Sequence, residues 1–451
     1  MSVLDSADVL RPAPGGIGGW ARARFMATIP FLLSIGRRFF PILKLGSMVV
    51  VTRYDDVLEV FATDTAFGVV YKPNLDVITG GEPFFLGMAN TQAYRDSLAA
   101  MHRMVLKTDL DRLGDEAERR AEAFVAAACG RVDVVALVRR VTFDTIAGYF
   151  GVPEPPLGRL DVWATRLFEY QFTGSPKDTD LLAQVQEIAP AFRAHVDAEI
   201  ARRKLAPHQD DVLGRCLDQQ AEGTPGYSDT EIRTALMCMV VGGPPQPPMV
   251  VPQGMEQILR RPDILAAAQR AALAGDNPTL HDILFEAMRF DPLAPGLPRE
   301  VLADTVLARG TPREKLIPKG ATVLACFASA MMDPRRIDNP TAFIPGRPPS
   351  AYIHFGHGLH ECFGRHINHA TLHRMLKPLL ARSGLRRAPG AEGRLSKNGI
   401  FAERLVVVHD WEGSSPFLKK RTKKLLSISR CLHDLERVQI KDDQAGDGND
   451  G

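Results

Sequence analysis

The stretch "HFGHGLHECFGRHI", residues 354–367, constrains the fold of this chain more than any other part of its sequence. Six of its positions fit the pattern F-G-x-G-x-H-x-C-x-G, namely Phe355, Gly356, Gly358, His360, Cys362 and Gly364. Glycines on both sides of a cysteine let the backbone pack close to a flat group and point amide hydrogens at the sulfur. Such hydrogen bonds favour the thiolate, the form of cysteine that binds metals. The pattern therefore predicts a bend that presents Cys362 as a metal ligand, with Phe355 screening the sulfur from water.

The motif resembles the haem-ligand signature of the cytochrome P-450 superfamily, and the resemblance extends from about residue 47 to residue 410. It implies a mainly α fold with small β-sheets, in which heme b (iron protoporphyrin IX) is buried between a central and a proximal helix. It also implies that Cys362 is the axial ligand, whose thiolate pushes electron density onto iron and favours O–O cleavage. We expect a haem domain over residues 1–410, with an N-terminal arm at 1–30. The tail, 411–451, is expected to be disordered or loosely attached.

A zinc site is the main alternative interpretation of the same stretch. Six histidines lie in it or just after it, namely His354, His357, His360, His366, His369 and His373. With Cys362 they could supply the four ligands of a tetrahedral site. No HExxH pattern accompanies them, however, and the glycines serve no purpose in binding zinc. We therefore expect the last three of these histidines to be ordinary helix residues.

A second motif, "FEAMRFDP", carries Glu286 and Arg289 three residues apart, on the same side of a helix. Taken alone, this spacing usually gives a surface ion pair of little energetic value. In the family, the matching E-x-x-R helix pairs with an arginine from the segment before the haem loop. Arg347 in "NPTAFIPGRP" stands at the matching place. The resemblance thus implies a structural, not catalytic, Glu–Arg–Arg network.

Haem carries two propionates, which need cationic or hydrogen-bonding partners inside the protein. The resemblance assigns one to His360, within the motif, and the other to Arg299, at the start of a predicted strand. A third contact is expected from the helix near "YRDSLAAMHRMVLK", which lacks the His-x-x-x-Arg pair common in the family. Three candidates remain open there: Arg95, His102 and Arg103.

The segment "VVGGPPQPPMVV" places four prolines where the flanking pattern favours one long helix. Proline in a helix interior removes a hydrogen bond and costs about 3 kcal/mol. The family's central helix usually carries (A/G)-G-x-(D/E)-T, whose acid and alcohol relay protons to bound dioxygen. Gly242 and Gly243 match, and Gly243 is expected to leave space for a ligand on iron. Pro245 replaces the acid and Gln246 replaces the threonine, and neither donates protons well.

Three functions remain open because of this departure. The first is a monooxygenase that oxidises a hydrophobic small molecule with electrons from a ferredoxin or reductase. The second uses peroxide, as a peroxygenase, or a lipid hydroperoxide, as do fatty-acid hydroperoxide isomerases, which have an amide-bearing central helix. In that case Gln246 would hydrogen-bond the distal oxygen of the hydroperoxide. The third is a haem binder without catalysis, and Gln246 would then only satisfy the backbone at a kink.

Composition limits which partners and which cellular compartment we expect for this chain. The formal charge of +2 over 451 residues predicts no nucleic-acid partner. Widely spaced cysteines without a CxxC pair are typical of a reducing compartment, and they favour free thiols and a cytoplasmic, soluble protein. The apolar run "FMATIPFLLSIG" is shorter than the ~20 residues of a bilayer span, so no transmembrane segment is expected. Contact of this run with a membrane surface remains open.

A hydrophobic substrate pocket is expected where four apolar segments meet. They are "DVITGGEPFFLGMAN", "RLFEYQFTG", "DPLAPGLP" and "NGIF". Their apolar and aromatic side chains favour a lipid-like or other hydrophobic small molecule as substrate.

Overall fold

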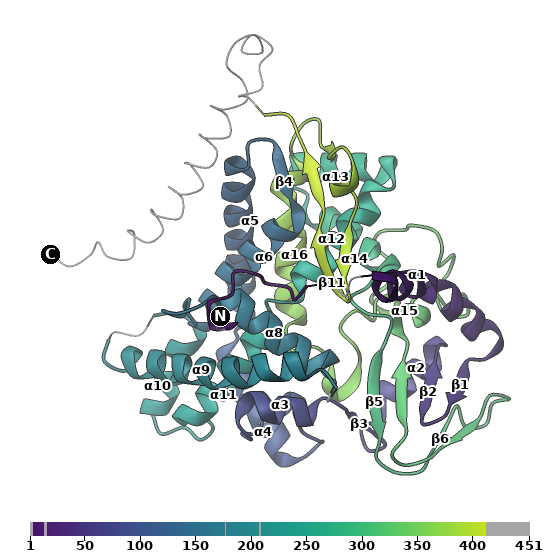
Figure 1. The fold of residues 1–451 in the computed structure, drawn as a ribbon, viewed down its shortest axis with the longest axis horizontal. Coiled ribbons are helices and arrows are strands. Elements are labelled where there is room, and N and C mark those ends of the chain that lie inside the picture. Colours follow the sequence, from purple (N-terminus) through teal and green to yellow (C-terminus); the bar gives the residue numbers. More distant parts are fainter. Residues whose placement is uncertain (1–2, 13–15, 176, 207–208, 412–451) are drawn as a thin grey trace, which may run out of the picture.

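The computed structural model describes residues 3–12, 16–175, 177–206 and 209–411, and it is mainly helical with small sheets (Figure 1). The α-helices are α1 (Gly16–Phe39), α2 (Tyr54–Ala62), α3 (Lys72–Thr79), α4 (Gln92–Met104), α5 (Leu110–Ala127), α6 (Val134–Thr142), α7 (Gly148–Phe150), α8 (Leu160–Thr173), α9 (Thr179–Arg203), α10 (Val212–Ala221), α11 (Asp229–Gly242), α12 (Pro247–Leu259), α13 (Pro262–Ala274), α14 (Asn277–Phe290), α15 (Phe327–Ala330) and α16 (Arg365–Leu380). The strands are β1 (Ile42–Leu45), β2 (Met48–Val51), β3 (Phe67–Val69), β4 (Arg131–Asp133), β5 (Leu297–Val301), β6 (Thr305–Leu307), β7 (Lys315–Ile317), β8 (Thr322–Ala325), β9 (Arg386–Arg387), β10 (Ser396–Asn398), β11 (Phe401–Arg404) and β12 (Val406–Val408). The predicted fold class is therefore confirmed.

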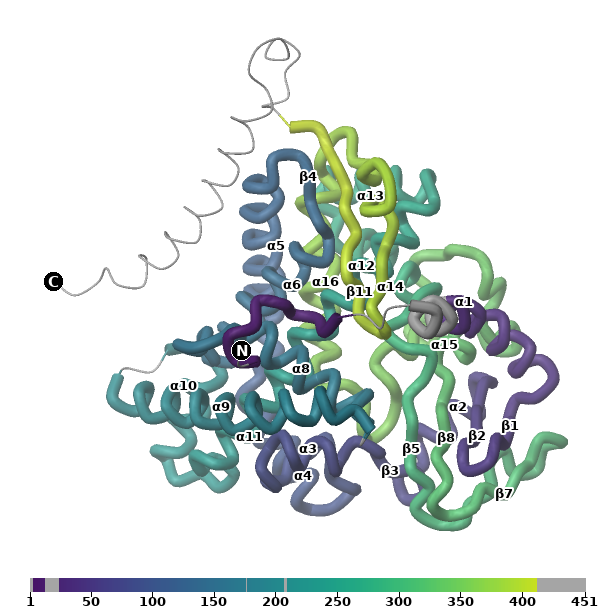
Figure 2. The backbone as a smooth tube through the Cα atoms, in the orientation of Figure 1, coloured from purple at the N-terminus to yellow at the C-terminus, as the bar shows by residue number. Residues whose placement is uncertain are grey.

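The largest sheet joins segments that are far apart in the sequence. Its strand order is β1-β2-β8-β5-β3, with β2 and β8 parallel and the other pairs antiparallel. Figure 2 shows this sheet at one side of the molecule, away from the bundle that holds α5, α6 and α16. β5 confirms the strand that was predicted at Arg299. The sheet therefore places Arg299, on β5, beside residues from the N-terminal part of the chain.

The helical region has two apolar cores. One lies among α3, α4 and α8–α11, and the other lies among α5, α6, α12–α14 and α16. α11 begins at a capping box, in which Ser228 accepts from the backbone N–H of Glu231 and the Glu231 carboxylate accepts from the backbone N–H of Ser228. This arrangement satisfies two of the N–H groups that a helix start leaves unpaired. α16 begins directly after Gly364, so the predicted cysteine bend leads straight into a buried helix.

Two expectations need correction. Residues 16–30 of the expected N-terminal arm belong to α1, which continues to Phe39 although Pro30 lies inside it. Cys129 is disulfide-bonded, so the expectation that the cysteines are free thiols is wrong for this residue. The expected tail lies outside the described residues except for Trp411.

Candidate functional site

The residues before Cys362 form the predicted bend. Gly356 and Gly358 have φ of 74° and 75°, in the left-handed region that favours glycine. A Cβ at Gly358 would lie 2.5 Å from the carbonyl oxygen of Phe61 on α2, so a side chain does not fit there. The backbone N–H of Cys362 donates to the Phe355 carbonyl at 2.9 Å and closes the bend. The Cys362 thiol is thus held by backbone geometry that this glycine spacing makes possible.

The sulfur of Cys362 sits in an interior setting. Burial raises the pKa of Cys362 to about 11, against a lowering effect from the backbone N–H of Gly364. A bonded cation is what turns such a buried thiol into a thiolate. Phe355 packs 6.1 Å from the ring of Phe285 and 5.3 Å from that of His369, between the bend and α14. These surroundings fit a thiolate ligand whose charge is balanced by a metal.

Arg299 and His360 supply the strongest test of the fit to haem. The Arg299 side chain is 6% exposed, donates to the Pro298 carbonyl at 3.0 Å and lies over the ring of Phe61. Within the described residues it has no carboxylate partner. His360 Nδ1 is buried without a hydrogen-bond partner, and burial, assisted by the charge of Arg299, lowers the pKa of His360 to about 4. A buried cation without an anion, near an orphaned imidazole nitrogen, fits the two propionates of haem.

Three residues on α4 were the candidates for a third contact with the haem propionates. All three are exposed, and Arg95 bonds to Asn90 and Gln92, while Arg103 donates to the Tyr227 hydroxyl at 3.2 Å. The ring of His102, in contrast, lies 4.9 Å from that of Phe363, next to the ligand cysteine. Geometry therefore favours His102.

Tyr94 and Tyr71 also reach this region and were missed in the sequence. The Tyr94 hydroxyl donates to the Leu359 carbonyl at 2.6 Å, inside the bend. Burial raises the pKa of Tyr71 to about 12, and both Arg299 and Cys362 are close enough to act on it. No motif marks either tyrosine. The only signal for Tyr94 was its place in the helix already expected to contact haem.

The structure brings Glu286, Arg289 and Arg347 together. Arg289 donates to both oxygens of Glu286 at 2.7 and 2.9 Å, and Arg347 Nε donates to Oε1 at 3.1 Å. Burial would raise the pKa of Glu286, but hydrogen bonds from Arg289, the Ile344 N–H and Arg347 lower it overall. The side chains of Glu286 and Arg289 are fully buried. This is a shielded network that ties α14 to the segment before the bend.

The central helix breaks at the prolines. α11 ends at Gly242 and α12 begins at Pro247, so the expected kink is a complete interruption. The Gln246 side-chain amide donates to the Gly242 carbonyl, one of those that the helix end leaves unpaired. A Cβ at Gly243 would lie 2.8 Å from the Met239 carbonyl oxygen. Residues 242–248 contain neither an acid nor an alcohol side chain.

The zinc alternative is wrong for the described residues, which contain no group of three metal-ligating side chains. His354 instead bonds to the Phe285 carbonyl at 3.0 Å. His369 lies on α16, stacks on the Phe285 ring and bonds to His281 at 2.8 Å. The histidines therefore point to different partners, although they are close in sequence.

All four segments expected to line a substrate pocket contribute to one large apolar core. Phe85, Phe168 and Phe401 belong to it, and Leu293 packs against it. The rings of Phe168 and Phe401 are 6.2 Å apart, and Phe172 packs against Tyr71 at 5.1 Å. Aromatic side chains thus meet where α8 contacts Phe401, the first residue of β11, and Tyr71, directly before α3.

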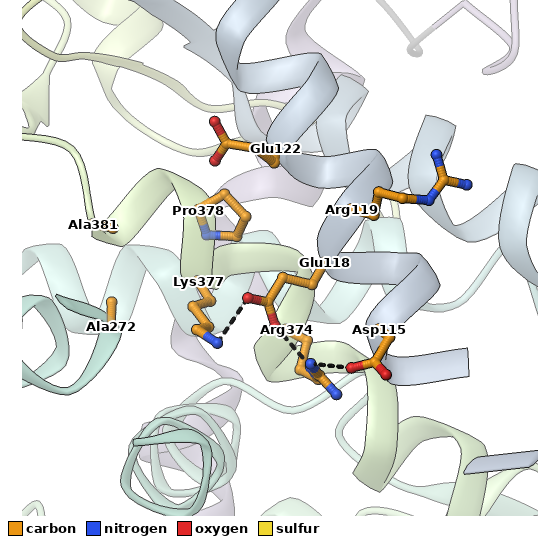
Figure 3. Close-up of a pocket in the computed structure, with 9 residues that line it drawn as sticks. All are labelled: Asp115, Glu118, Arg119, Glu122, Ala272, Arg374, Lys377, Pro378 and Ala381. Atoms are coloured by element: carbon orange, nitrogen blue, oxygen red, sulfur yellow. Dashed lines mark hydrogen bonds and ion pairs between the residues drawn. The ribbon is translucent and has the colours of Figure 1, made fainter. Parts of the chain in front are cut away.

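A separate hollow of about 440 Å³ lies between α5, α13 and α16 (Figure 3). It is lined by Asp115, Glu118, Arg119, Glu122, Ala272, Arg374, Lys377, Pro378 and Ala381. Glu118 pairs with Arg374 at 2.8 Å and with Lys377 at 2.7 Å. Asp115 also pairs with Arg374, and the other charged lining residues, Arg119 and Glu122, pair with Glu116 and Arg382. The pairs of Glu118 and Asp115 hold α5 against α16, and the hollow offers no unpaired charge to a ligand.

Comparison with known proteins agrees with this geometry. The family model described as "Cytochrome P450" matches residues 179–399. A bifunctional dioxygenase–epoxy alcohol synthase of Fusarium oxysporum is 33% identical over 126 residues, 27% of this chain and 10% of that protein. The cytochrome P450 monooxygenase PikC of Streptomyces venezuelae is 26% identical over 269 residues, 59% of each chain. The alignments therefore span less than two thirds of these relatives.

Solved structures show the same fold over most of the chain. A mutant of P450 EryK in complex with erythromycin B has a TM-score of 0.70 at 22% identity, and the match covers 89% of this chain and 99% of that one. The family match, the shared fold and the glycine-lined cysteine motif have one common explanation. The chain belongs to the cytochrome P450 superfamily.

Proposed function

We propose that this protein is a haem-thiolate oxidoreductase, and specifically a monooxygenase that oxidises a hydrophobic small molecule. The observation that carries the proposal is the Cys362 thiol in its glycine-lined bend, close to a buried Arg299 without a carboxylate partner among the described residues and to the unbonded Nδ1 of His360. Residues 1–410 would form the haem domain. Its electrons would come from a ferredoxin or a reductase, and no nucleic acid would be involved. We place it in the cytoplasm.

Each site residue has a role in this proposal. Cys362 would hold heme b as the axial thiolate, and Arg299, His360 and His102 would bind its propionates. When bound, this group supplies an iron centre at which O–O bonds are cleaved. The Glu286 network would keep the proximal bend in place, because moving it would expose buried charges. The aromatic cluster of Phe85, Phe168 and Phe401 would bind an apolar substrate and exclude water.

Use of peroxide or a lipid hydroperoxide is the second candidate function. One observation favours it: Pro245 and Gln246 stand where a dioxygen-activating relay would place an acid and an alcohol. The similarity to a dioxygenase–epoxy alcohol synthase points the same way. The Gln246 Nε2 amide would have to leave the Gly242 carbonyl, or share its hydrogens, to meet a hydroperoxide.

One pair of assays separates the two functions. The haem-loaded protein is given a fatty-acid hydroperoxide without reductant and, separately, a panel of hydrophobic substrates with reduced ferredoxin and dioxygen. Turnover only in the second assay supports the monooxygenase, whereas fast conversion to diols or epoxy alcohols in the first supports the hydroperoxide enzyme. A purified protein that contains zinc and no haem would overturn both.

A further inference from the structure

The N-terminal part of the chain exposes large apolar side chains to an unusual degree. We define the N-terminal apolar patch as Phe25, Phe31, Leu32, Phe39, Phe40 and Leu45. Phe25, Phe31 and Phe39 are 60%, 66% and 61% exposed. Scattered exposed leucines are normal on a protein surface, but aromatic residues gathered in one segment mark an interaction site.

Three members of the patch share one side of α1. Phe25, Leu32 and Phe39 follow at intervals of seven residues, which places them on one helix face. The C-terminal end of the helix is attached to the fold. Arg37 donates to the Ser329 hydroxyl at 2.9 Å, and a Cβ at Gly36 would lie 3.4 Å from Thr52. Phe25, Leu32 and Phe39 nevertheless stay exposed.

The start of the sheet extends the patch. Phe40 donates its N–H to the Gly36 carbonyl, and the N–H of Thr52, after β2, donates to the Pro41 carbonyl at 3.0 Å. Leu45 lies on the edge strand β1 and pairs with Met48 on β2. Figure 2 shows α1, β1 and β2 following one another at the same side of the molecule, in purple.

The charged side chains of the N-terminal segment that carries the patch are all basic. No Asp or Glu occurs between Asp8 and Asp55, although the whole chain contains 53 acidic residues in 451. Arg24, Arg38 and Lys44 are exposed beside the apolar side chains. Apolar residues flanked by cations only are complementary to a surface that is apolar inside and anionic outside.

We propose that the N-terminal apolar patch docks this protein onto the surface of an anionic lipid bilayer. α1 lies in the interface, because none of the described helices is long and apolar enough to cross a membrane. A second copy of the chain fits the patch less well. Symmetric pairing would bring Arg38 and Lys44 near their own copies, with no acid in the segment to balance them. The proposal is independent of the proposed function.

Vesicle flotation of the full-length, haem-loaded protein tests the docking. We expect binding to phosphatidylcholine vesicles that contain phosphatidylglycerol, weak binding to pure phosphatidylcholine, and release by salt. The variant Phe25→Ser/Phe31→Ser/Leu32→Ser should bind more than about tenfold more weakly. Leu157→Ser/Leu205→Ser/Leu273→Ser is the matched control, since these leucines are 70%, 91% and 72% exposed elsewhere.

Charge is tested separately with Arg38→Glu/Lys44→Glu, which should weaken binding about tenfold or more. Arg119→Glu/Arg270→Glu changes the net charge equally at another surface and should bind like the parent. The basic run "KKRTKK" stays intact in every variant, so differences report the patch. An unchanged absorption spectrum and melting temperature show that the variants fold.

Two results would overturn the proposal. In the first, the Phe25/Phe31/Leu32 variant floats with anionic vesicles as well as the parent does. In the second, vesicles do not bind the parent, and sedimentation in lipid-free buffer shows a dimer that this variant loses, which assigns the patch to a second copy. Because flotation needs no turnover, a failure of the proposed function would leave this result interpretable.

Discussion

The segments expected on the two sides of the haem differ in their polar chemistry. On the Cys362 side, Glu286, Arg289 and Arg347 are buried and every one of them is bonded. At the helix break on the other side, Gln246 is the one polar side chain in residues 242–248, and its amide is bonded to its own backbone. The network beside Cys362, the proposed ligand, thus follows the family pattern, whereas the groups that would move protons are replaced. Fold and cofactor can be retained while the oxidant changes, because they depend on different residues.

The largest expected effect is that of Cys362→Ala. Without the thiol, the far-red Soret band of the reduced, carbon-monoxide-bound protein should disappear, and turnover should fall more than about a thousandfold, because the axial ligand is lost. Cys326→Ala is the control, since Cys326 is another free thiol, buried on the sheet side. If the far-red band survives in Cys362→Ala, Cys362 is not the thiolate ligand, and the comparison of the two sides of the haem loses its basis.

Glu286→Gln tests the network on the ligand side. Removing one charge of a buried ion pair leaves the guanidinium groups of Arg289 and Arg347 uncompensated, at about 3–5 kcal/mol in the free energy of unfolding. Glu116 and Arg119 have the same three-residue spacing on an exposed part of α5. Glu116→Gln should therefore cost less than about 1 kcal/mol. Equal costs in urea denaturation would show that burial does not set the strength of this network.

Lowering the pH should reduce the stability of the protein on the Cys362 side, because His354 must then take up a proton. The buried His354 donates to the Phe285 carbonyl as a neutral ring, and burial lowers its pKa to about 4, below the ~6.5 of an unfolded chain. Its contribution is therefore complete above pH ~6.5 and falls as the pH drops towards 4. His354→Gln should reduce the loss of stability between pH 7 and 4.5 by about 2 kcal/mol. His357→Gln, at an exposed position, should leave that loss unchanged, and denaturation at both pH values measures it.

Gln246→Leu tests the helix break and should have the smallest effect on stability. Losing the bond to the Gly242 carbonyl costs about 1 kcal/mol, because water can reach part of this half-buried turn. If the amide also acts on the oxidant, oxygen–oxygen cleavage should slow while substrate affinity stays constant. Rapid-mixing rates and a binding titration separate these outcomes. Unchanged rates and product ratios would restrict Gln246 to satisfying the backbone.

Local pattern was enough to predict the ligand bend and the network. The glycines at 356 and 358 predicted a backbone conformation that only glycine adopts easily. The E-x-x-R spacing predicted that Glu286 and Arg289 share one helix face. Arg95, His102 and Arg103 could not be ranked in the same way. All three lie on α4, and only their neighbours Gln92, Tyr227 and Phe363 decide where each one points.

By itself the sequence predicted which sulfur could act as a metal ligand, because that property follows from residue type and spacing within a few turns of chain. It also determined that the helix before Pro244 and Pro245 must stop, which it does at Gly242. Only the tertiary structure decided that Arg299 would be buried without an anion, that Gln246 would bond to its own helix, and that the aromatic face of α1 would stay uncovered. Those outcomes depend on which distant segments pack together, and packing is a sum of many weak contacts that no short motif records.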